Sequence, residues 1–307
     1  MNNHTLTVRS LRRRAGFSLI EMLVVIGILG VLAAVTLSQF SGATESAKAA
    51  QCMSNMRNLA VAAGNYAMAN EWGNYPHADS YTYAKLRGRE LGREMAKGWV
   101  SRDKSGMNGG WSKNGKVGGS VPFNTQDDIL RAWAITNGTL WQYVGNSYEV
   151  YTCPVHVKAC QKKNGKHPAW SFVMNQEFGY ASSGETDNWV GKNMSSLPGP
   201  ERWLLFAELQ AMDVKNTGKR GERVAQDLRA MVDVGGTEAD GVLQWDREFI
   251  GFNHKSKSGY MGHVAFADGH VQKVMCPQQG SLKELTEWMC KGYELSFDGK
   301  QYRRTDK

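Results

Sequence analysis

The pattern of hydrophobic and polar positions changes sharply near the start of the chain. Residues 1–16 are rich in polar residues and include four arginines, and an apolar run then extends from Phe17 to Leu37. Within these 21 residues only Ser18, Glu21 and Thr36 are polar. A helix of that length rises about 30 Å, which is the thickness of the hydrocarbon core of a bilayer. The pattern therefore predicts a helix that can cross a membrane once.

The helical pattern continues beyond the apolar run. No proline interrupts residues 38–70, and one set of apolar residues recurs there at a spacing of three or four: Ala49, Met53, Met56, Ala60, Ala63 and Ala67. This spacing places them on one helix face. We therefore expect one nearly continuous helix from Phe17 to about Asn70, with its first half in lipid or in a filament and its second half packed on a globular domain.

Residues 71–307 carry the patterns of a domain with short strands. RWLLFAE at residues 202–208 predicts a buried strand, and residues 150–153 predict another. Alternating residues on both sides of Asp268-Gly269 predict a hairpin with a two-residue turn, and the same pattern recurs around Asp298-Gly299. The fold class is therefore α+β, with a small antiparallel sheet packed against the long N-terminal helix.

The distribution of arginine predicts the orientation of the apolar helix. Four arginines precede it and none follows closely, so the N-terminus is expected in the cytoplasm and the globular domain outside the membrane. The whole chain has a formal charge of +8, which by itself would suggest a nucleic acid or a membrane surface as a partner. Residues 1–16 contain four of the basic residues and no acid. Their removal would leave a charge of +4, so nucleic acid is not an expected partner.

Glu21 is an unusual residue for an apolar helix, because an ionised carboxylate in lipid costs about 2–3 kcal/mol. Cleavage between Gly16 and Phe17 would create an α-ammonium group four residues before it. That group could neutralise Glu21 in the same chain or in a neighbouring one. Two alternatives remain. The helix could be a simple anchor in which Glu21 reaches the interface, or a secretory peptidase could cleave after Ser41-Gly42-Ala43.

The segment GFSLIEMLVVIGIL resembles the signal of type IV pilins and type II secretion pseudopilins. The resemblance implies cleavage after Gly16 by a prepilin peptidase, N-methylation of Phe17 and pairing of Glu21 with a neighbouring subunit during assembly. The three segments are then a leader at 1–16, a transmembrane and spine helix at 17–70, and an exported head at 71–307. The expected partners are the prepilin peptidase, other pilin or pseudopilin subunits, the inner membrane and the secretion or pilus assembly machinery.

The C-terminal half carries a second resemblance. FADGHV, with His254 before Asp268-Gly269, is similar to the H-X9-DG region of large pilin-like proteins. Thirteen residues separate His254 from Asp268 here instead of nine, so the spacing departs from the family pattern at His254. Together the two resemblances imply a pilin-like fold. They also imply a location in the inner membrane with a periplasmic head, followed by a pilus or pseudopilus that can reach the cell surface.

The five cysteines lie in the exported part of the chain, where disulfides can persist. The nearest-neighbour pairs, Cys153–Cys160 and Cys276–Cys290, are the expected bridges, and Cys52 is expected to be a small buried residue. None of them has the CxxC spacing of a zinc ribbon, so neither a metal nor another cofactor is expected.

The histidines are expected to have structural roles. His254, His263, Asp268 and His270 lie close together in sequence and could suggest a metal or acid–base site, but the hairpin already accounts for Asp268. Glu208 could pair with Arg202 or with a histidine, or it could ligate a cation. No nucleophile elbow, HExxH motif or nucleotide fingerprint is present, so no enzyme activity is expected.

The expected function is that of a structural pilin-like subunit. The alternative is a membrane-tethered extracellular protein that binds glycans or DNA. For glycans, the aromatic residues that could line a binding face are Trp99, Trp111, Trp133, Trp141 and Trp170.

Overall fold

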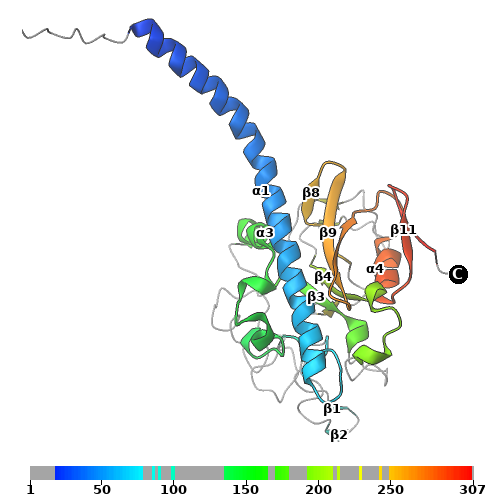
Figure 1. Cartoon of the computed structure of the whole chain (residues 1–307). Coiled ribbons are helices and arrows are strands. Elements are labelled where there is room, and N and C mark those ends of the chain that lie inside the picture. Colours follow the sequence, from blue (N-terminus) through cyan, green and yellow to red (C-terminus); the bar gives the residue numbers. More distant parts are fainter. Residues whose placement is uncertain are drawn as a thin grey trace, which may run out of the picture. The chain divides into compact units, whose positions relative to one another are not determined.

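The structure is a computed structural model (Figure 1). It describes residues 18–78, 85–86, 89–90, 98–100, 135–164, 170–179, 192–209, 213–214, 228–229, 242–243 and 249–305. The chain divides into two compact units, Met1–Ser46 and Ala47–Lys307. The division falls within the first helix, so the second part of that helix belongs to the larger unit.

Helix α1 extends from Leu19 to Ala69, close to the range expected from the sequence. Its N-terminus is a capping box, because the Ser18 hydroxyl accepts from the backbone N–H of Ile20 at 3.3 Å and the Glu21 carboxylate accepts from the backbone N–H of Ser18 at 2.7 Å. At the C-terminus Asn70 donates to the carbonyl of Tyr66. Within the described part of the chain, no helix is at once long enough and apolar enough to cross a membrane.

The head contains a six-stranded sheet with the strand order β10-β9-β4-β3-β7, in which β8 also pairs with β9. The strands are β3 (Phe172–Asn175), β4 (Leu204–Glu208), β7 (Val242–Leu243), β8 (His254–Ser256), β9 (Gly259–Phe266) and β10 (Val271–Met275). All neighbours are antiparallel except β3 and β7, which are parallel. An N-terminal helix followed by a domain with an antiparallel sheet is the α+β arrangement that the sequence predicts.

The two faces of the sheet bury two different cores. Side chains alternate along β3 and β9, so that Phe172 and Ala265 join one core and Val173 and Val264 join the other. The first core contains the buried face of α1, including Cys52, Met56 and Leu59. The second core contains α4 (Leu282–Cys290). The sheet is therefore packed between α1 and α4 (Figure 1).

The remaining described elements are short. The helices are η1 (Trp141–Val144), η2 (Glu149–Tyr151), α3 (Pro154–Asn164), η3 (Gln176–Phe178), η4 (Met194–Ser196) and η5 (Pro200–Arg202). Three two-stranded ribbons pair β1 (Lys85–Leu86) with β2 (Arg89–Glu90), β5 (Asp213–Val214) with β6 (Leu228–Arg229), and β11 (Leu295–Phe297) with β12 (Tyr302–Arg304). The β11–β12 ribbon is the hairpin predicted around Asp298-Gly299.

Two local predictions are wrong. The strand expected at residues 150–153 is a short 3₁₀ helix, η2, that leads directly into α3 through Cys153. The β9–β10 hairpin is present, but its turn is longer than expected, because the backbone N–H of Phe266 donates to the carbonyl of His270 and leaves three residues between them. Gly269 lies at φ +89°, which is the left-handed residue that a three-residue hairpin turn requires.

Candidate functional site

The first candidate site is the N-terminal motif. Gly16 and Phe17 lie outside the described residues, and Glu21 occupies the first turn of α1. Its carboxylate reaches back to the Ser18 N–H, one residue from the expected cleavage point. Along the following turns large apolar side chains are exposed in the single chain, from Leu19 at 90% to Leu32 at 56%. Such a surface is what a protein buries in lipid or against other subunits.

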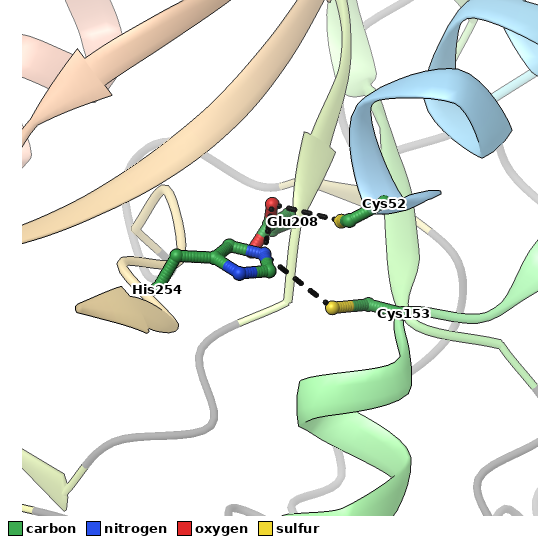
Figure 2. Close-up of side chains that lie close together, drawn as sticks. All are labelled: Cys52, Cys153, Glu208 and His254. Carbon is green, nitrogen blue, oxygen red and sulfur yellow. Dashed lines mark hydrogen bonds and ion pairs between the residues drawn. The ribbon is translucent and has the colours of Figure 1, made fainter. Parts of the chain in front are cut away.

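The second candidate site is a buried cluster of ionisable side chains in the head (Figure 2). It contains Cys52, Cys153, Glu208, His254 and His263, and each is between 0% and 1% exposed. They come from α1, the start of α3, β4, β8 and β9. We name these five residues the Cys–His–Glu cluster.

The sheet register places the carboxylate and the two imidazoles together. Ala207 of β4 pairs with Val264 of β9, so the next residues, Glu208 and His263, lie opposite each other on the face that α1 covers. His254 begins β8 opposite Met261, which is on the same face of β9 as His263. The two histidine rings meet edge to face with their centroids 4.7 Å apart.

A close backbone approach brings β8 to this position. A Cβ atom at Gly262 would lie 1.9 Å from the carbonyl oxygen of Gly251. Only glycine at residue 262 therefore allows the segment that precedes His254 to pass directly over β9.

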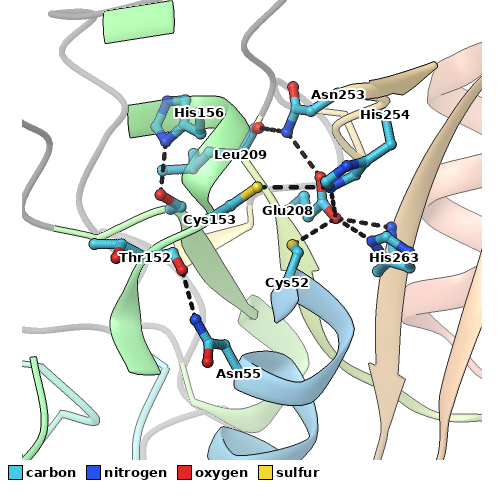
Figure 3. Close-up of polar contacts among 11 residues, drawn as sticks. Cys52, Asn55, Thr152, Cys153, His156, Glu208, Leu209, Asn253, His254 and His263 are labelled. Atoms are coloured by element: carbon cyan, nitrogen blue, oxygen red, sulfur yellow. Dashed lines mark hydrogen bonds and ion pairs between the residues drawn. The ribbon is translucent and has the colours of Figure 1, made fainter. Parts of the chain in front are cut away.

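The two cysteines reach the cluster from helices. Cys52 lies on the buried face of α1. Cys153 occupies the N-terminus of α3, where its carbonyl accepts from the N–H of Val157 at 2.9 Å. Asn55, one turn after Cys52, donates to the carbonyls of Glu149 and Thr152 at 2.8 and 2.9 Å. These bonds hold the segment before Cys153 against α1 (Figure 3).

Glu208 is the centre of the hydrogen-bond network (Figure 3). Its Oε1 lies 3.0 Å from Cys52 Sγ, 3.1 Å from His254 Nε2 and 2.6 Å from His263 Nδ1. The backbone N–H of His263 approaches the same oxygen at 3.2 Å. Asn253 Nδ2 donates to the other oxygen, Oε2, at 2.8 Å. Four donors thus converge on one carboxylate oxygen, which offers about two lone-pair positions.

Burial shifts a pKa in the direction that favours the neutral form of the group. For Glu208, His254 and Cys153, hydrogen bonds and nearby charges outweigh burial and shift the pKa in the opposite direction. Burial alone would raise the pKa of Glu208, yet the hydrogen bonds from His254 and His263 hold it well below the usual range. Burial would lower the pKa of His254, whereas Cys153 and Glu208 raise it to about 10. Burial would raise the pKa of Cys153, but Cys52 and His254 lower it to about 6.

Cys52 differs from the other three groups, because burial, the hydrogen bond with Cys153 and the charge of Glu208 all raise its pKa. Burial and the neighbouring groups therefore act in the same direction only on the pKa of Cys52.

The cluster has the composition of a metal site. One ligand atom each from Cys52, Cys153, Glu208 and His254 lies within 4.8 Å of the others. The same proximity would also permit a disulfide between the two cysteines. The low exposure of these residues keeps their atoms from meeting a substrate in solution unless the head opens.

The two expected disulfides are not formed, because Cys153 and Cys276 are free cysteines. Cys153 lies 3.5 Å from His254 Nε2. Cys276 follows β10, whereas the carbonyl of Cys290 accepts from Asn175 of β3. Both cysteines are free, so the expected bridge between them is absent. The side chain of Cys160 lies outside the described residues.

The other site residues named from the sequence separate into two groups. Glu208 pairs with histidines, one of the options that the sequence left open, while Arg202 pairs with Glu294 at 3.0 Å. His270 and Asp268 do not join the cluster. They hydrogen-bond to each other at 2.6 Å in the exposed hairpin turn, where His270 stacks on Phe266.

Two tryptophans that could have served a glycan-binding face belong to the core instead. Trp99 and Trp170 are 0% and 2% exposed, and Trp99 packs against Tyr151 and Phe206. Trp141 is half-buried, and Trp111 and Trp133 lie outside the described residues.

Comparison with known protein families matches residues 11–37 to the prokaryotic N-terminal methylation motif. No curated protein matches the chain, and no solved structure does. The motif is consistent with a type IV pilin or pseudopilin and implies a structural rather than an enzymatic protein. The match ends at residue 37, so the resemblance of the C-terminal region to H-X9-DG proteins stays a prediction.

Proposed function

We propose that this protein is a structural pilin-like subunit that assembles into a type IV pilus or a type II secretion pseudopilus. Prepilin peptidase cleaves the chain after Gly16, and Phe17 is then N-methylated. The N-terminal methylation motif at residues 11–37 is the observation that carries the proposal. No observation favours the glycan- or DNA-binding alternative.

Before assembly, the apolar segment that starts at Phe17 anchors the chain in the inner membrane with the head in the periplasm. The proposal rests on the sequence, in which the arginines precede the segment and 18 of its 21 residues lack a polar side chain. In the filament, the exposed apolar side chains at the start of α1 pack against those of other subunits.

Glu21 directs the packing of neighbouring subunits. The capping box already brings its carboxylate to the N–H of Ser18. After cleavage, the ammonium group of Phe17 lies one residue from that contact. It neutralises the Glu21 carboxylate within the same chain before assembly. In the filament, Glu21 instead pairs with the ammonium group of a neighbouring chain. Neutral pairing lowers the cost of keeping Glu21 in an apolar environment.

The proposal is tested by the intact mass of the mature protein and by filament incorporation. We expect the mass of a chain that begins at Phe17 and carries one added methyl group. We expect Glu21→Val to be cleaved but to be absent from sheared filaments, because the ammonium group loses its partner. Glu45→Val, an exposed acid on the same helix outside the motif, is the control and should assemble. A mature chain beginning after Ala43, or normal assembly of Glu21→Val, would contradict the proposal.

A further inference from the structure

We propose that the Cys–His–Glu cluster is a structural zinc site with Cys52, Cys153, Glu208 and His254 as its four ligands. The inference concerns the head and does not depend on the proposed function. The site would join α1, the N-terminus of α3, β4 and β8 through one ion (Figure 2).

The chemistry of the donor set favours zinc. Two sulfurs, one imidazole nitrogen and one carboxylate oxygen are all ligands that Zn²⁺ accepts, and four ligands are the number in its structural sites. Hard cations such as calcium and magnesium require oxygen ligands in greater number.

The distances agree with a tetrahedral centre. Zinc–ligand bonds of about 2.0–2.3 Å at tetrahedral angles separate nitrogen from oxygen by about 3.3 Å, and sulfur from either by about 3.5 Å. His254 Nε2 lies 3.1 Å from Glu208 Oε1 and 3.5 Å from Cys153 Sγ. Cys52 Sγ, at 3.0 Å from Glu208 Oε1, would move outward by roughly 0.5 Å.

Hydrogen bonds alone do not account for the number of polar atoms that approach His254 Nε2 and Glu208 Oε1. His254 Nε2 can donate one proton, yet it faces both Glu208 and Cys153. Glu208 Oε1 faces more donors than it has lone pairs. A single ion between the four ligand atoms would replace the protons that Cys52 and His254 otherwise have to share with their neighbours.

His263 and Asn253 are positioning residues in this site. His263 Nδ1 hydrogen-bonds to Glu208 Oε1 at 2.6 Å, and Asn253 Nδ2 donates to Oε2 at 2.8 Å. Together they fix the plane of the carboxylate, as the hydrogen-bonding partners of metal ligands commonly do.

The test uses the full chain, purified in mild detergent with reductant and without chelator. Elemental analysis should find one zinc ion per chain. Unfolding in EDTA and refolding with Co²⁺ should produce the intense visible bands of tetrahedral cobalt and the near-ultraviolet bands of thiolate–cobalt charge transfer. Cys52→Ser and Cys153→Ser should each lose the bound zinc. Cys276→Ser, which removes a free thiol outside the cluster, should retain it.

Three results would overturn the proposal. The first is a folded wild-type chain that takes up neither zinc nor cobalt, and the second is a different metal bound in stoichiometric amount. The third is a Cys52–Cys153 disulfide without metal in chain isolated from outside the cytoplasm, detected by mass spectrometry after alkylation. If the cysteine variants do not fold, the cobalt spectrum of Cys276→Ser still decides, because tetrahedral cobalt with thiolate bands in that variant cannot depend on the Cys276 thiol, and their loss there would contradict the proposal.

Discussion

At the scale of single residues, Asn55 shows how one polar side chain in a helix can position a distant segment. It is 8% exposed on α1, and its Nδ2 group serves two carbonyls in the segment that leads to Cys153. The carbonyl of Glu149 also accepts from the backbone N–H of Thr152 at 3.1 Å, whereas Thr152 lies between the end of η2 and the start of α3. Asn55 therefore determines where Cys153 lies relative to Cys52.

We expect Asn55→Ala to lower the free energy of unfolding of the head by about 1–2 kcal/mol, because the carbonyls of Glu149 and Thr152 each lose a hydrogen bond from the Asn55 amide. Thermal or denaturant unfolding followed by tryptophan fluorescence would measure it. Asn58→Ala is the matched control, since Asn58 is exposed on the same helix. Both substitutions replace asparagine by alanine and therefore raise the intrinsic helix propensity by the same amount. Equal stability of the two variants would show that the Asn55 hydrogen bonds contribute nothing.

Among the ionisable residues, Glu208 could be foreseen in part. An acid at the end of an apolar strand has to find a partner when that strand is buried, and the sequence therefore offered a histidine, an arginine or a cation. Which of these it meets depends on the register of β4 against β9, which no local pattern reveals. Cys52 and Cys153 are 101 residues apart in the chain, and no spacing rule for metal ligands could have joined them.

At the scale of elements, glycine has opposite roles in β9 and in α1. Gly262 lies under the backbone of Gly251, where a side chain has no room. Gly64 of α1 has nothing within 4 Å of the position that a Cβ atom would take. The first glycine is required by packing, and the second is a weak point in its helix.

These contacts predict opposite effects of the same substitution. Gly262→Ala should destabilise the head by about 1–3 kcal/mol or more, because β9 and the segment before His254 are forced apart. Gly64→Ala should stabilise it by about 0.5–1 kcal/mol, because alanine loses less backbone entropy in a helix. Unfolding midpoints of the two full-length variants, measured side by side, would check both signs. A stabilising Gly262→Ala would mean that β8 and β9 are not packed as described.

The long helix was the element that the sequence predicted best, since its apolar residues recur every three or four positions over many turns. The segment at residues 150–153 was predicted wrongly, because a short apolar run fits a strand and a buried 3₁₀ turn equally well. The hairpin around Asp268-Gly269 was predicted correctly, but its turn has three residues instead of the expected two, because the last backbone hydrogen bond joins Phe266 to His270.

At the scale of the whole molecule, the head begins inside the helix. The larger compact unit starts at Ala47, and the α1 side chains in its first core include several with no exposed surface: Cys52, Met56, Leu59, Ala63 and Ala67. They cover the sheet face opposite α4. A head defined to start at residue 71 would lack one side of its own core.

We therefore expect a fragment of residues 47–307 to fold and to unfold cooperatively in water. A fragment of residues 71–307 should instead aggregate or show no cooperative transition, because the apolar face that α1 covers becomes exposed. Circular dichroism during thermal unfolding of the two fragments would distinguish them. A cooperative transition in the shorter fragment would show that α1 is not an integral part of the head.

The sequence by itself determined the N-terminal motif, the long helix and the α+β class of the head. These features depend on residues close together in the chain: Gly16, Phe17 and Glu21 in one register, an apolar stripe along one helix, and alternation on both sides of a turn. Only the tertiary structure decided which cysteines, histidines and acids meet. Their contacts depend on strand order, strand register and the packing of α1 on the sheet, which arise from many weak interactions between segments far apart in the chain.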